Sequence, residues 1–348
     1  MKKLVKYLSP FAPDQSGACG VLYELGGLMV VCDAGGCAGN ICGFDEPRWF
    51  TKRSAVFSAG LRDMDAILGR DDKLIKKLTV ANSQLDCKFT ALIGTPVPAV
   101  IATDFAALKK LAEKKTGLPC ITVECTGTHY YDEGERKAWL ALFREFARED
   151  FGTVPGRVGI IGATPLETSM MTNERIISRC RDMGISEPVV YGMGSTLEDV
   201  VRAASCERNI AVSAAAIPAC QYLKERFGTP YEAAFPFLPE SFKTELAGAE
   251  GRTLIIHSQL IANEIRKLLP EGSADCASFF TIAKSLAQEN DTELRSEEQL
   301  LELLQKGGYQ TLIADGEVRK LLRAAGFEGS FIELDHFAVS GRLWDTEE

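Results

Sequence analysis

The cysteines are the residues of this 348-residue chain whose types and spacing suggest chemistry, because eleven cysteines accompany only three histidines. Three of them lie in segments rich in glycine and other small residues: Cys19 in 16–20 (SGACG), Cys37 in 35–39 (GGCAG) and Cys125 before 126–128 (TGT). Thiolate is the soft ligand that iron–sulfur clusters take. Glycine lets backbone amides approach a bulky anion and donate hydrogen bonds to its sulfurs. The pattern therefore indicates a cluster bound by these cysteines, with Gly35, Gly36 and Gly127 against it.

A second interpretation is that the cysteines are small buried hydrophobic residues, which is the commonest use of a free cysteine. We favour it for the five that lie outside glycine-rich segments, Cys87, Cys180, Cys206, Cys220 and Cys276. Cys32 and Cys42, each five positions from Cys37, stay between the two interpretations. No ferredoxin spacing and no C-x-x-C pair occurs, so the spacing predicts neither a ferredoxin nor a zinc site.

Composition and missing motifs exclude several other classes of function. The net charge of −9 offers no basic face for nucleic acid. The chain has no G-x-x-x-x-G-K-[ST], no complete G-x-G-x-x-G, no G-x-S-x-G and no H-E-x-x-H, which argues against ATP hydrolysis and zincin chemistry. No apolar run reaches the length of a membrane span, and no signal-type apolar segment follows the first lysines. We therefore expect a cytoplasmic protein without membrane or nucleic-acid partners.

Strand-like and helix-like segments alternate along the chain, and this order must position the cysteines. Apolar runs predict strands at 28–32, 88–93, 120–124, 157–161, 188–191, 209–213, 253–256, 276–280, 309–314 and 330–334. Helical periodicity predicts helices at 105–115, 139–148, 175–183, 219–227, 260–269 and 317–325. The acidic stretch 288–298 is interpreted as a solvated loop and helix start.

Such alternation predicts an α/β fold of mostly parallel sheets flanked by helices. Breaks in composition at 152–156 and 247–251 divide the chain into three Rossmann-like domains, at residues 1–150, 151–248 and 249–348. Ligands of open α/β sheets bind beyond the carboxyl ends of the strands. Cys37 and Cys125 each follow a predicted strand of the first domain, so we expect that domain to carry the cluster cysteines.

These segments together resemble the nitrogenase component 1 superfamily, which includes nitrogenase molybdenum–iron proteins, their assembly scaffolds and the dark-operative protochlorophyllide and chlorophyllide reductases. The resemblance lies first in Gly17–Cys19, in the strand and turn 28–37 (LMVVCDAGGC), and in 121–127 (ITVECTG). It continues through 157–162, 209–212, 222–230 and 310–315, and so covers nearly the whole chain.

The resemblance implies an iron–sulfur cluster, either 4Fe–4S or P-cluster-like 8Fe–7S, held by Cys19, Cys37 and Cys125 at a subunit interface. It implies a homodimer, or a heterodimer with a sister subunit, with a fourth ligand from Asp33, Cys32, Cys42 or the partner chain. A separate ATP-dependent reductase of the iron-protein type would supply low-potential electrons, which would pass to a substrate in the cleft between the domains. Catalytic residues are not assigned.

The chain also departs from the family pattern. Val212–Ala214 stand where nitrogenase places its cofactor cysteine, and His336 is one residue out of register with the cofactor histidine. Dinitrogen reduction is therefore not expected. A metallocluster or tetrapyrrole assembly scaffold and a cluster-free ligand-binding module remain alternatives. His129 is interpreted as a loop residue or a proton donor near the cluster, and His257 as a loop residue without a partner.

Overall fold

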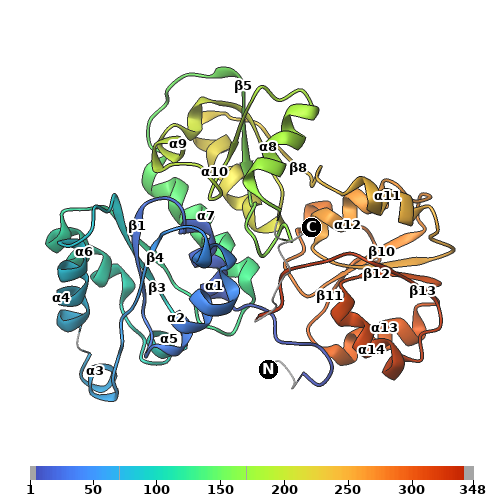
Figure 1. Ribbon diagram of the computed structural model, residues 1–348, viewed down its shortest axis with the longest axis horizontal. Coiled ribbons are helices and arrows are strands. Elements are labelled where there is room, and N and C mark those ends of the chain that lie inside the picture. The colour runs from blue at the N-terminus through green and yellow to red at the C-terminus, as the bar shows by residue number, and fades with distance from the viewer. Residues whose placement is uncertain (1–4, 70, 170, 341–348) are drawn as a thin grey trace.

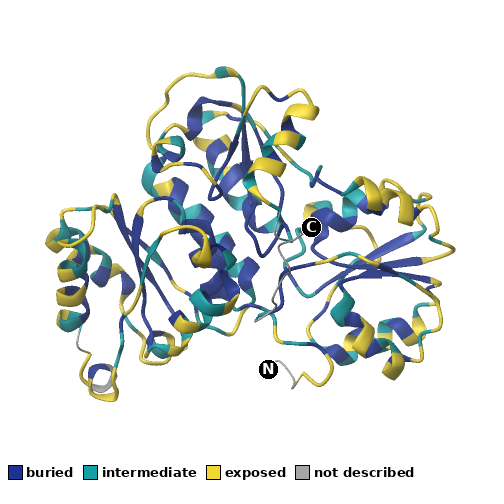
Figure 2. Ribbon diagram, viewed as in Figure 1, coloured by how far each residue is buried: buried dark blue, intermediate teal, exposed yellow. Residues whose placement is uncertain are grey.

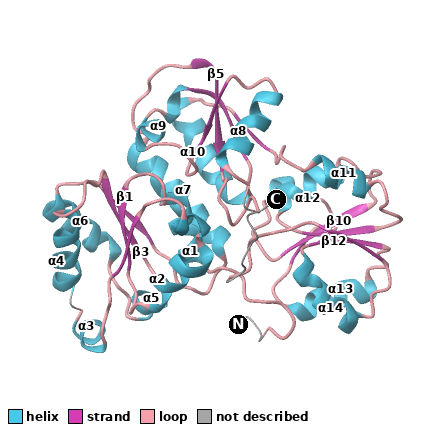
Figure 3. Cartoon of the chain, in the orientation of Figure 1, coloured by secondary structure: helices cyan, strands magenta, loops and turns pink. Residues whose placement is uncertain are grey.

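The structure is a computed structural model that describes residues 5–69, 71–169 and 171–340. Three separate parallel sheets follow one another along the chain, and helices cover them (Figures 1 and 3). We refer to each sheet with its helices as a unit. All ladders between the strands are parallel, so the predicted α/β fold with mostly parallel sheets is confirmed.

The first unit has the strand order β2-β1-β3-β4. Its strands are β1 (Gly27–Val31), β2 (Ala55–Ser58), β3 (Phe89–Ile93) and β4 (Cys120–Val123). Its helices are α1 (Asp14–Leu22), α2 (Gly36–Asn40), η1 (Ile41–Asp45), η2 (Pro47–Phe50), α3 (Asp63–Leu68), α4 (Asp71–Asn82), α5 (Pro96–Val100), α6 (Phe105–Thr116) and α7 (Tyr131–Phe146). Every residue of β1 and β3 is buried, as expected for strands covered on both faces.

The second unit has the order β6-β5-β7-β8. Its elements are β5 (Val154–Ile161), α8 (Asn173–Asp182), β6 (Glu187–Val190), α9 (Leu197–Val201), η3 (Ala203–Ser205), β7 (Cys206–Ala211), η4 (Ala214–Ala216), α10 (Ile217–Phe227) and β8 (Tyr231–Ala233). The third unit has the order β11-β10-β9-β12-β13. Its elements are α11 (Glu240–Leu246), β9 (Thr253–Ile256), α12 (Gln259–Arg266), β10 (Ala274–Ser278), η5 (Lys284–Leu286), β11 (Thr292–Glu293), α13 (Glu297–Lys306), β12 (Thr311–Ala314), η6 (Gly316–Val318), α14 (Arg319–Ala325) and β13 (Ser330–Glu333).

Each predicted strand overlaps an observed one, whereas three short strands, β2, β8 and β11, were not predicted. All three lie at the edge of their sheets. An edge strand buries less apolar surface than a central one, and β2 is half-buried to exposed, so its apolar signal is weak. The acidic stretch 288–298 does contain the start of α13, together with the short edge strand β11.

The units share hydrophobic cores. One core joins the first and second units across α7, where Trp139 and Phe143 pack with Tyr191. Another joins the second and third units, with Ile160 and Ile255 among its members. Figure 2 shows the sheets buried inside all three units. None of the helices in the described part of the chain has both the length and the apolar composition needed to span a bilayer.

The segment of residues 5–13 leaves the first unit and lies against the third. The amides of Lys6, Tyr7 and Leu8 donate to the Glu297 carboxylate at distances of 2.6–2.9 Å. Phe11 forms an isolated antiparallel bridge with Val339. Residues from both extremities of the described chain therefore meet on one face of the third unit.

Candidate functional site

The cysteines singled out by the sequence lie around the carboxyl edge of the first sheet. Cys37 follows β1 in the short helix α2, and Cys125 comes two residues after β4. Between β1 and β4 lies β3, and it ends next to Gly94. A side chain on Gly94 would come within 2.7 Å of the Cys125 carbonyl oxygen, so this glycine lets the two strand ends lie close together.

Cys19 does not lie in a glycine-rich loop, contrary to the expectation for its segment. It lies within α1, all of whose residues are buried. Helices α1 and α7 pack so closely that each needs a glycine at the contact. A Cβ added at Gly17 of α1 would stand 2.0 Å from the Tyr131 backbone oxygen, and one added at Gly134 of α7 would stand 1.7 Å from the Asp14 backbone oxygen. Gly17 thus serves close packing of α1 against α7, whereas the sequence pattern indicated that the glycines of this segment leave room for a cluster.

The structure brings the three candidate ligands to one side of the first sheet. Cys19 and Cys125 belong to the same buried hydrophobic cluster, and Cys37 packs against that cluster. Burial, and then the neighbouring Cys125 and Cys42, raise the pKa of the Cys19 thiol well above its usual value. Among the described residues, no three His, Cys, Asp or Glu side chains are gathered so that they could hold a single metal ion.

Buried carboxylates fix the loops that carry the cysteines. Asp14 accepts hydrogen bonds from the amides of Thr126 (2.9 Å) and Gly127 (2.8 Å), so the Gly127 amide is directed at Asp14. Gly127 has φ +69°, and an added Cβ would clash with Pro96. Asp33 accepts from the Ala38 amide (2.8 Å) and in this way holds the start of the helix that carries Cys37.

Glycines leave the surface next to Cys37 free of side chains. Gly35, with φ +123°, precedes α2, and at Gly36 an added Cβ would meet nothing within 4 Å. The same is true at Gly39 and Gly43. Phe44, in the segment that follows, is a large apolar residue that is 51% exposed. Cys37 and Cys42 are half-buried at this surface.

The electrostatic surroundings oppose thiolate formation. Burial and nearby carboxylates raise the pKa of Cys37, with Asp33 and Asp14 as the charged neighbours. Burial and Asp14 likewise raise the pKa of Cys125 above its ordinary range. Deprotonating these thiols therefore needs a compensating positive charge, which a bound metal supplies.

The candidates for a fourth ligand are placed differently. Cys32 belongs to the hydrophobic core on the other face of the sheet, with Leu74 and Leu108. Asp33 is buried and bonded to both Ser58 Oγ and the Ala38 amide. Cys42, in η1, is close enough to Cys19 to raise the pKa of that thiol. Of the three, Cys42 is the side chain on the same side as Cys19 and half-buried at the surface.

The three histidines have distinct surroundings. The His129 side chain is 55% exposed in the loop after Cys125, and its Nδ1 lies 3.8 Å from Asp14 Oδ2. His257 does have partners, contrary to expectation: it is buried and its ring stacks on that of His336, with centroids 4.2 Å apart. His336 Nε2 lies 2.8 Å from the hydroxyl of Tyr131, which donates to Glu167 Oε2 at 2.6 Å. Sequence reasoning did not find Tyr131 or Glu167, because neither stands in a recognisable motif.

The space available differs between these regions. An open hollow of about 610 Å³ borders Cys125 and is lined in part by Arg136, Lys137 and Arg144. The cavity between His257 and His336 measures about 30 Å³, the share of a single water. It does not accommodate a planar ring of tetrapyrrole size.

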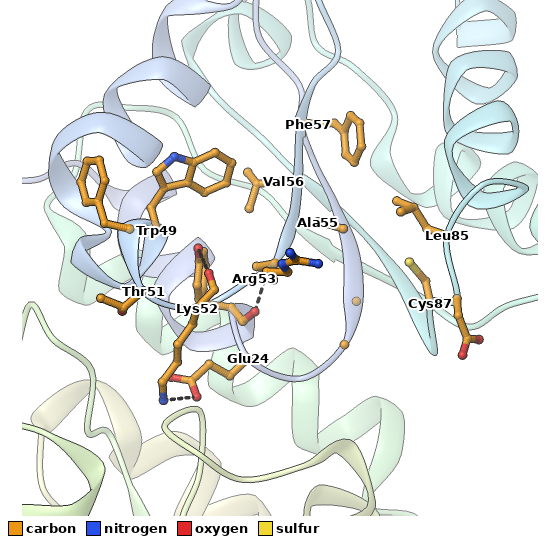
Figure 4. A pocket seen from close by; sticks show the side chains of 16 residues that line it. Glu24, Trp49, Thr51, Lys52, Arg53, Ala55, Val56, Phe57, Leu85 and Cys87 are labelled. Atoms are coloured by element: carbon orange, nitrogen blue, oxygen red, sulfur yellow. Dashed lines mark hydrogen bonds and ion pairs between the residues drawn. The ribbon is translucent and has the colours of Figure 1, made fainter.

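A third hollow, of about 880 Å³, lies at the opposite, amino end of the first sheet (Figure 4). Figure 4 shows Trp49 and Val56 on one side and Leu85 and Cys87 on the other, with Lys52 paired to Glu24. Because ligands of open parallel sheets bind beyond the carboxyl ends of the strands, the cysteine edge is the better candidate site.

Comparison with known proteins adds the family and the fold. A family model described as nitrogenase component 1 type oxidoreductase matches residues 15–274. A solved structure described as "Nitrogenase Cp1 at pH 6.5" shares 10% identity at a TM-score of 0.71, over 98% of this chain and 88% of that chain. Another, "Nitrogenase Cp1 at pH 5", shares 12% identity at a TM-score of 0.69, over 97% and 85%. A search of curated proteins gave no match.

Proposed function

The chain belongs to the nitrogenase component 1 type oxidoreductase family, and from this premise we propose that it binds an iron–sulfur cluster through Cys19, Cys37 and Cys125 and acts in low-potential electron transfer. The observation that carries the proposal is the gathering of these three cysteines on one side of the first sheet, two in one buried cluster and the third packed against it. All three lie within the residues that the family model matches.

The donor set fits such a cluster. Thiolates are the ligands that iron–sulfur clusters take, and each cysteine binds a different iron, so the three sulfurs need not converge on one point. When bound, such a cluster takes up and releases single electrons at low potential. The protein's own part is to bury Cys19 and Cys125 and to leave Cys37 half-buried at the surface. Asp14 holds the loop that follows Cys125, and Asp33 holds the start of the helix that carries Cys37.

The open side of the site supports a dimer. Gly36, Gly39 and Gly43 place no side chains over Cys37 and Cys42, and Phe44, in the same short helix as Cys42, is exposed. A second copy, or a sister subunit, that covers this face would bury the aromatic ring of Phe44 and exclude water from the cluster. The partner would also bring the remaining ligands of the cluster. The described residues of one chain contain no complete site for a single metal ion, which is consistent with a shared site.

The electron donor we propose is a separate ATP-dependent reductase of the iron-protein type. The chain itself has no phosphate-binding G-x-x-x-x-G-K-[ST] motif, so ATP hydrolysis belongs to a partner. The electrons then pass to a substrate, for which the open hollow beside Cys125 offers more room than the small cavity between the histidines. An assembly scaffold would have the same ligand set, and it would release its cargo intact to an acceptor protein.

The test is the iron and acid-labile sulfide content of protein purified without oxygen. We expect about two to four irons per chain in the wild type and nearly none in Cys125→Ser. Cys180→Ser is the matched control, because Cys180 is buried in α8 of the second unit, in a different core. An iron-free, folded wild type would contradict the proposal and favour a cluster-free binding module.

A further inference from the structure

Three buried side chains, one from each unit, meet at the centre of the molecule. Tyr131 is the first residue of α7, Glu167 follows β5 of the second unit, and His336 follows β13 of the third. Tyr131 Oη lies 2.6 Å from Glu167 Oε2 and 2.8 Å from His336 Nε2. All three residues are at most 5% exposed. One phenol therefore joins all three units by hydrogen bonds.

The phenol has one proton to share between two neighbours. When Glu167 is ionised, Tyr131 donates to the carboxylate and accepts from a protonated His336 Nε2. When Glu167 is protonated, the carboxyl can donate to the phenol oxygen, and Tyr131 then donates to His336 Nε2. The chain of bonds is complete in both cases, but the second arrangement leaves no charge at the junction.

The groups around Glu167 offer little to stabilise a negative charge. Glu135 Oε2 is buried without a hydrogen-bond partner, and the hydroxyls of Tyr131 and Ser258 are the uncharged groups beside the Glu167 carboxyl. In the described part of the chain, no lysine or arginine forms an ion pair with Glu167 or Glu135. Arg48 acts on Glu135 only through its field and is bonded to Glu46 and Glu24. Buried carboxylates in such surroundings are costly unless they carry a proton.

The remaining titratable neighbours belong to α7 and the third unit. Asp132 accepts from the amide (2.8 Å) and the hydroxyl (2.6 Å) of Thr281, which ties α7 to the third unit. The Ser258 amide donates to His257 Nδ1 at 2.8 Å, so His257 carries its proton on Nε2 and is neutral. Burial lowers the pKa of His257 to about 4. His257 therefore adds no positive charge that could compensate Glu167.

We propose that the proton on Glu167 controls how tightly the three units are held together, and that its loss loosens the junction formed by Tyr131, Glu167 and His336. Ionisation leaves a buried carboxylate with a second buried carboxyl, Glu135, beside it and no cation paired to either in the described part of the chain. Water then has to reach these groups, and it does so by partial separation of the first turn of α7 from the loops after β5 and β13.

Burial raises the pKa of Glu167 to about 7, and the hydroxyls of Tyr131 and Ser258 oppose this rise. The closed junction therefore holds a proton that the open junction, with a carboxyl near its ordinary value of about 4.3, does not hold. Linkage then makes opening more favourable as pH rises from about 5 to 7, by about tenfold per pH unit, and constant above 7. Folding lowers the pKa of His257, so protonation of His257 favours opening as pH falls, which is the opposite of the effect of Glu167. Wild type is therefore compared at each pH with a variant that keeps His257.

The experiment is hydrogen–deuterium exchange of wild type and Glu167→Gln, compared at each pH from 5 to 8. The peptides to follow cover residues 128–135 and 333–339, which are identical in both proteins, so intrinsic exchange and His257 cancel in the ratio. We expect the ratio of wild-type to variant exchange to rise about tenfold per pH unit up to 7 and then to level off. A ratio that is the same at pH 5 and pH 8 would overturn the proposal.

Glu174→Gln is the matched control, since Glu174 is exposed on α8 of the same unit and should leave the wild-type profile unchanged. Tyr131→Phe provides a second test if Glu167→Gln does not fold. Without the phenol donor, the pKa of Glu167 in the closed junction rises further, so the increase in exchange should begin at the same pH but level off at a pH above 7. An unmoved profile in Tyr131→Phe would also count against the junction as described.

Discussion

The cysteine edge of the first sheet and the junction around Tyr131 are both polar centres in an apolar interior, but they are built in opposite ways. At the cysteine edge, glycines leave surface uncovered and two thiols, Cys37 and Cys42, are half-buried. At the junction, phenol, carboxyl and imidazole are buried and bonded to one another, and the cavity that His336 lines measures about 30 Å³. The first region is suited to receive a further component, and the second is complete within the chain.

The junction is filled by this chain's own side chains. The cysteine edge keeps donor atoms, open surface and an adjoining hollow, so a ligand is to be sought there first. Four substitutions, at Gly134, Glu167, Tyr131 and Phe44, test whether the two regions are independent.

Gly134→Val should disrupt both regions at once. The Cβ would stand 1.7 Å from the Asp14 backbone oxygen, and Asp14 in turn holds the Cys125 loop. We expect a loss of more than about 4 kcal/mol in the free energy of unfolding, or no folded protein. Urea denaturation followed by circular dichroism measures this. Gly39→Ala, where an added Cβ meets nothing within 4 Å, should stay within about 0.5 kcal/mol of wild type.

Glu167→Gln should change the pH dependence of stability at the junction alone. The folded pKa of about 7 exceeds the unfolded value, so the folded state binds the extra proton and wild-type stability falls as pH rises between about 4.3 and 7. Relative to Glu167→Gln, the free energy of unfolding of wild type should fall by about 3 kcal/mol between pH 4 and pH 8. Parallel urea titrations that show a constant difference would contradict the protonation we assign. Iron content should be the same in both proteins.

Tyr131→Phe should cost about 1–3 kcal/mol of stability at pH 6, because it leaves the buried groups of Glu167 and His336 without their common partner. Its iron content and cluster spectrum should match those of wild type if the two regions are independent. A loss of iron in this variant would show instead that the junction helps to hold the cysteine edge. Tyr222→Phe is a suitable control, since that hydroxyl makes one long bond of 3.4 Å to the Ala147 carbonyl oxygen.

Phe44→Ser should have the smallest effect on the single chain. Phe44 lies in η1 beside Cys42 and is 51% exposed, so the change should alter monomer stability by less than about 1 kcal/mol. If the cysteine edge is a subunit interface, however, the same change should weaken the dimer by about tenfold or more in Kd. Analytical ultracentrifugation over a concentration series measures this. Val80→Ser, at a position 52% exposed on α4, serves as the control.

The sequence predicted the fold class well because buried parallel strands are near-continuous apolar runs, as in β1 and β12. The edge strand β2 and helix α1 could not be found in this way. Gly17 of α1 serves contact with α7, which depends on residues more than a hundred positions away, since Gly17 faces the Tyr131 backbone and Gly134 faces Asp14.

The candidate site was partly predictable for the same reason. Cysteines next to glycines at strand ends are visible in sequence, and these positions led to Cys37 and Cys125. The junction was not visible, because Tyr131, Glu167 and His336 come from three distant segments and become a unit only through packing. His257 was assigned no partner since its stacking on His336 joins two loops 79 residues apart.

The segment of residues 5–13 has a consequence for how the protein is made. Its backbone bonds with Glu297 and its bridge from Phe11 to Val339 join it to residues that are synthesised much later. At about 5–20 residues per second, a ribosome needs about 15–70 seconds to reach Val339 after Phe11. During that time the apolar side chains of Leu8 and Phe11 have no permanent site, which makes this segment a natural place for a chaperone to bind the nascent chain.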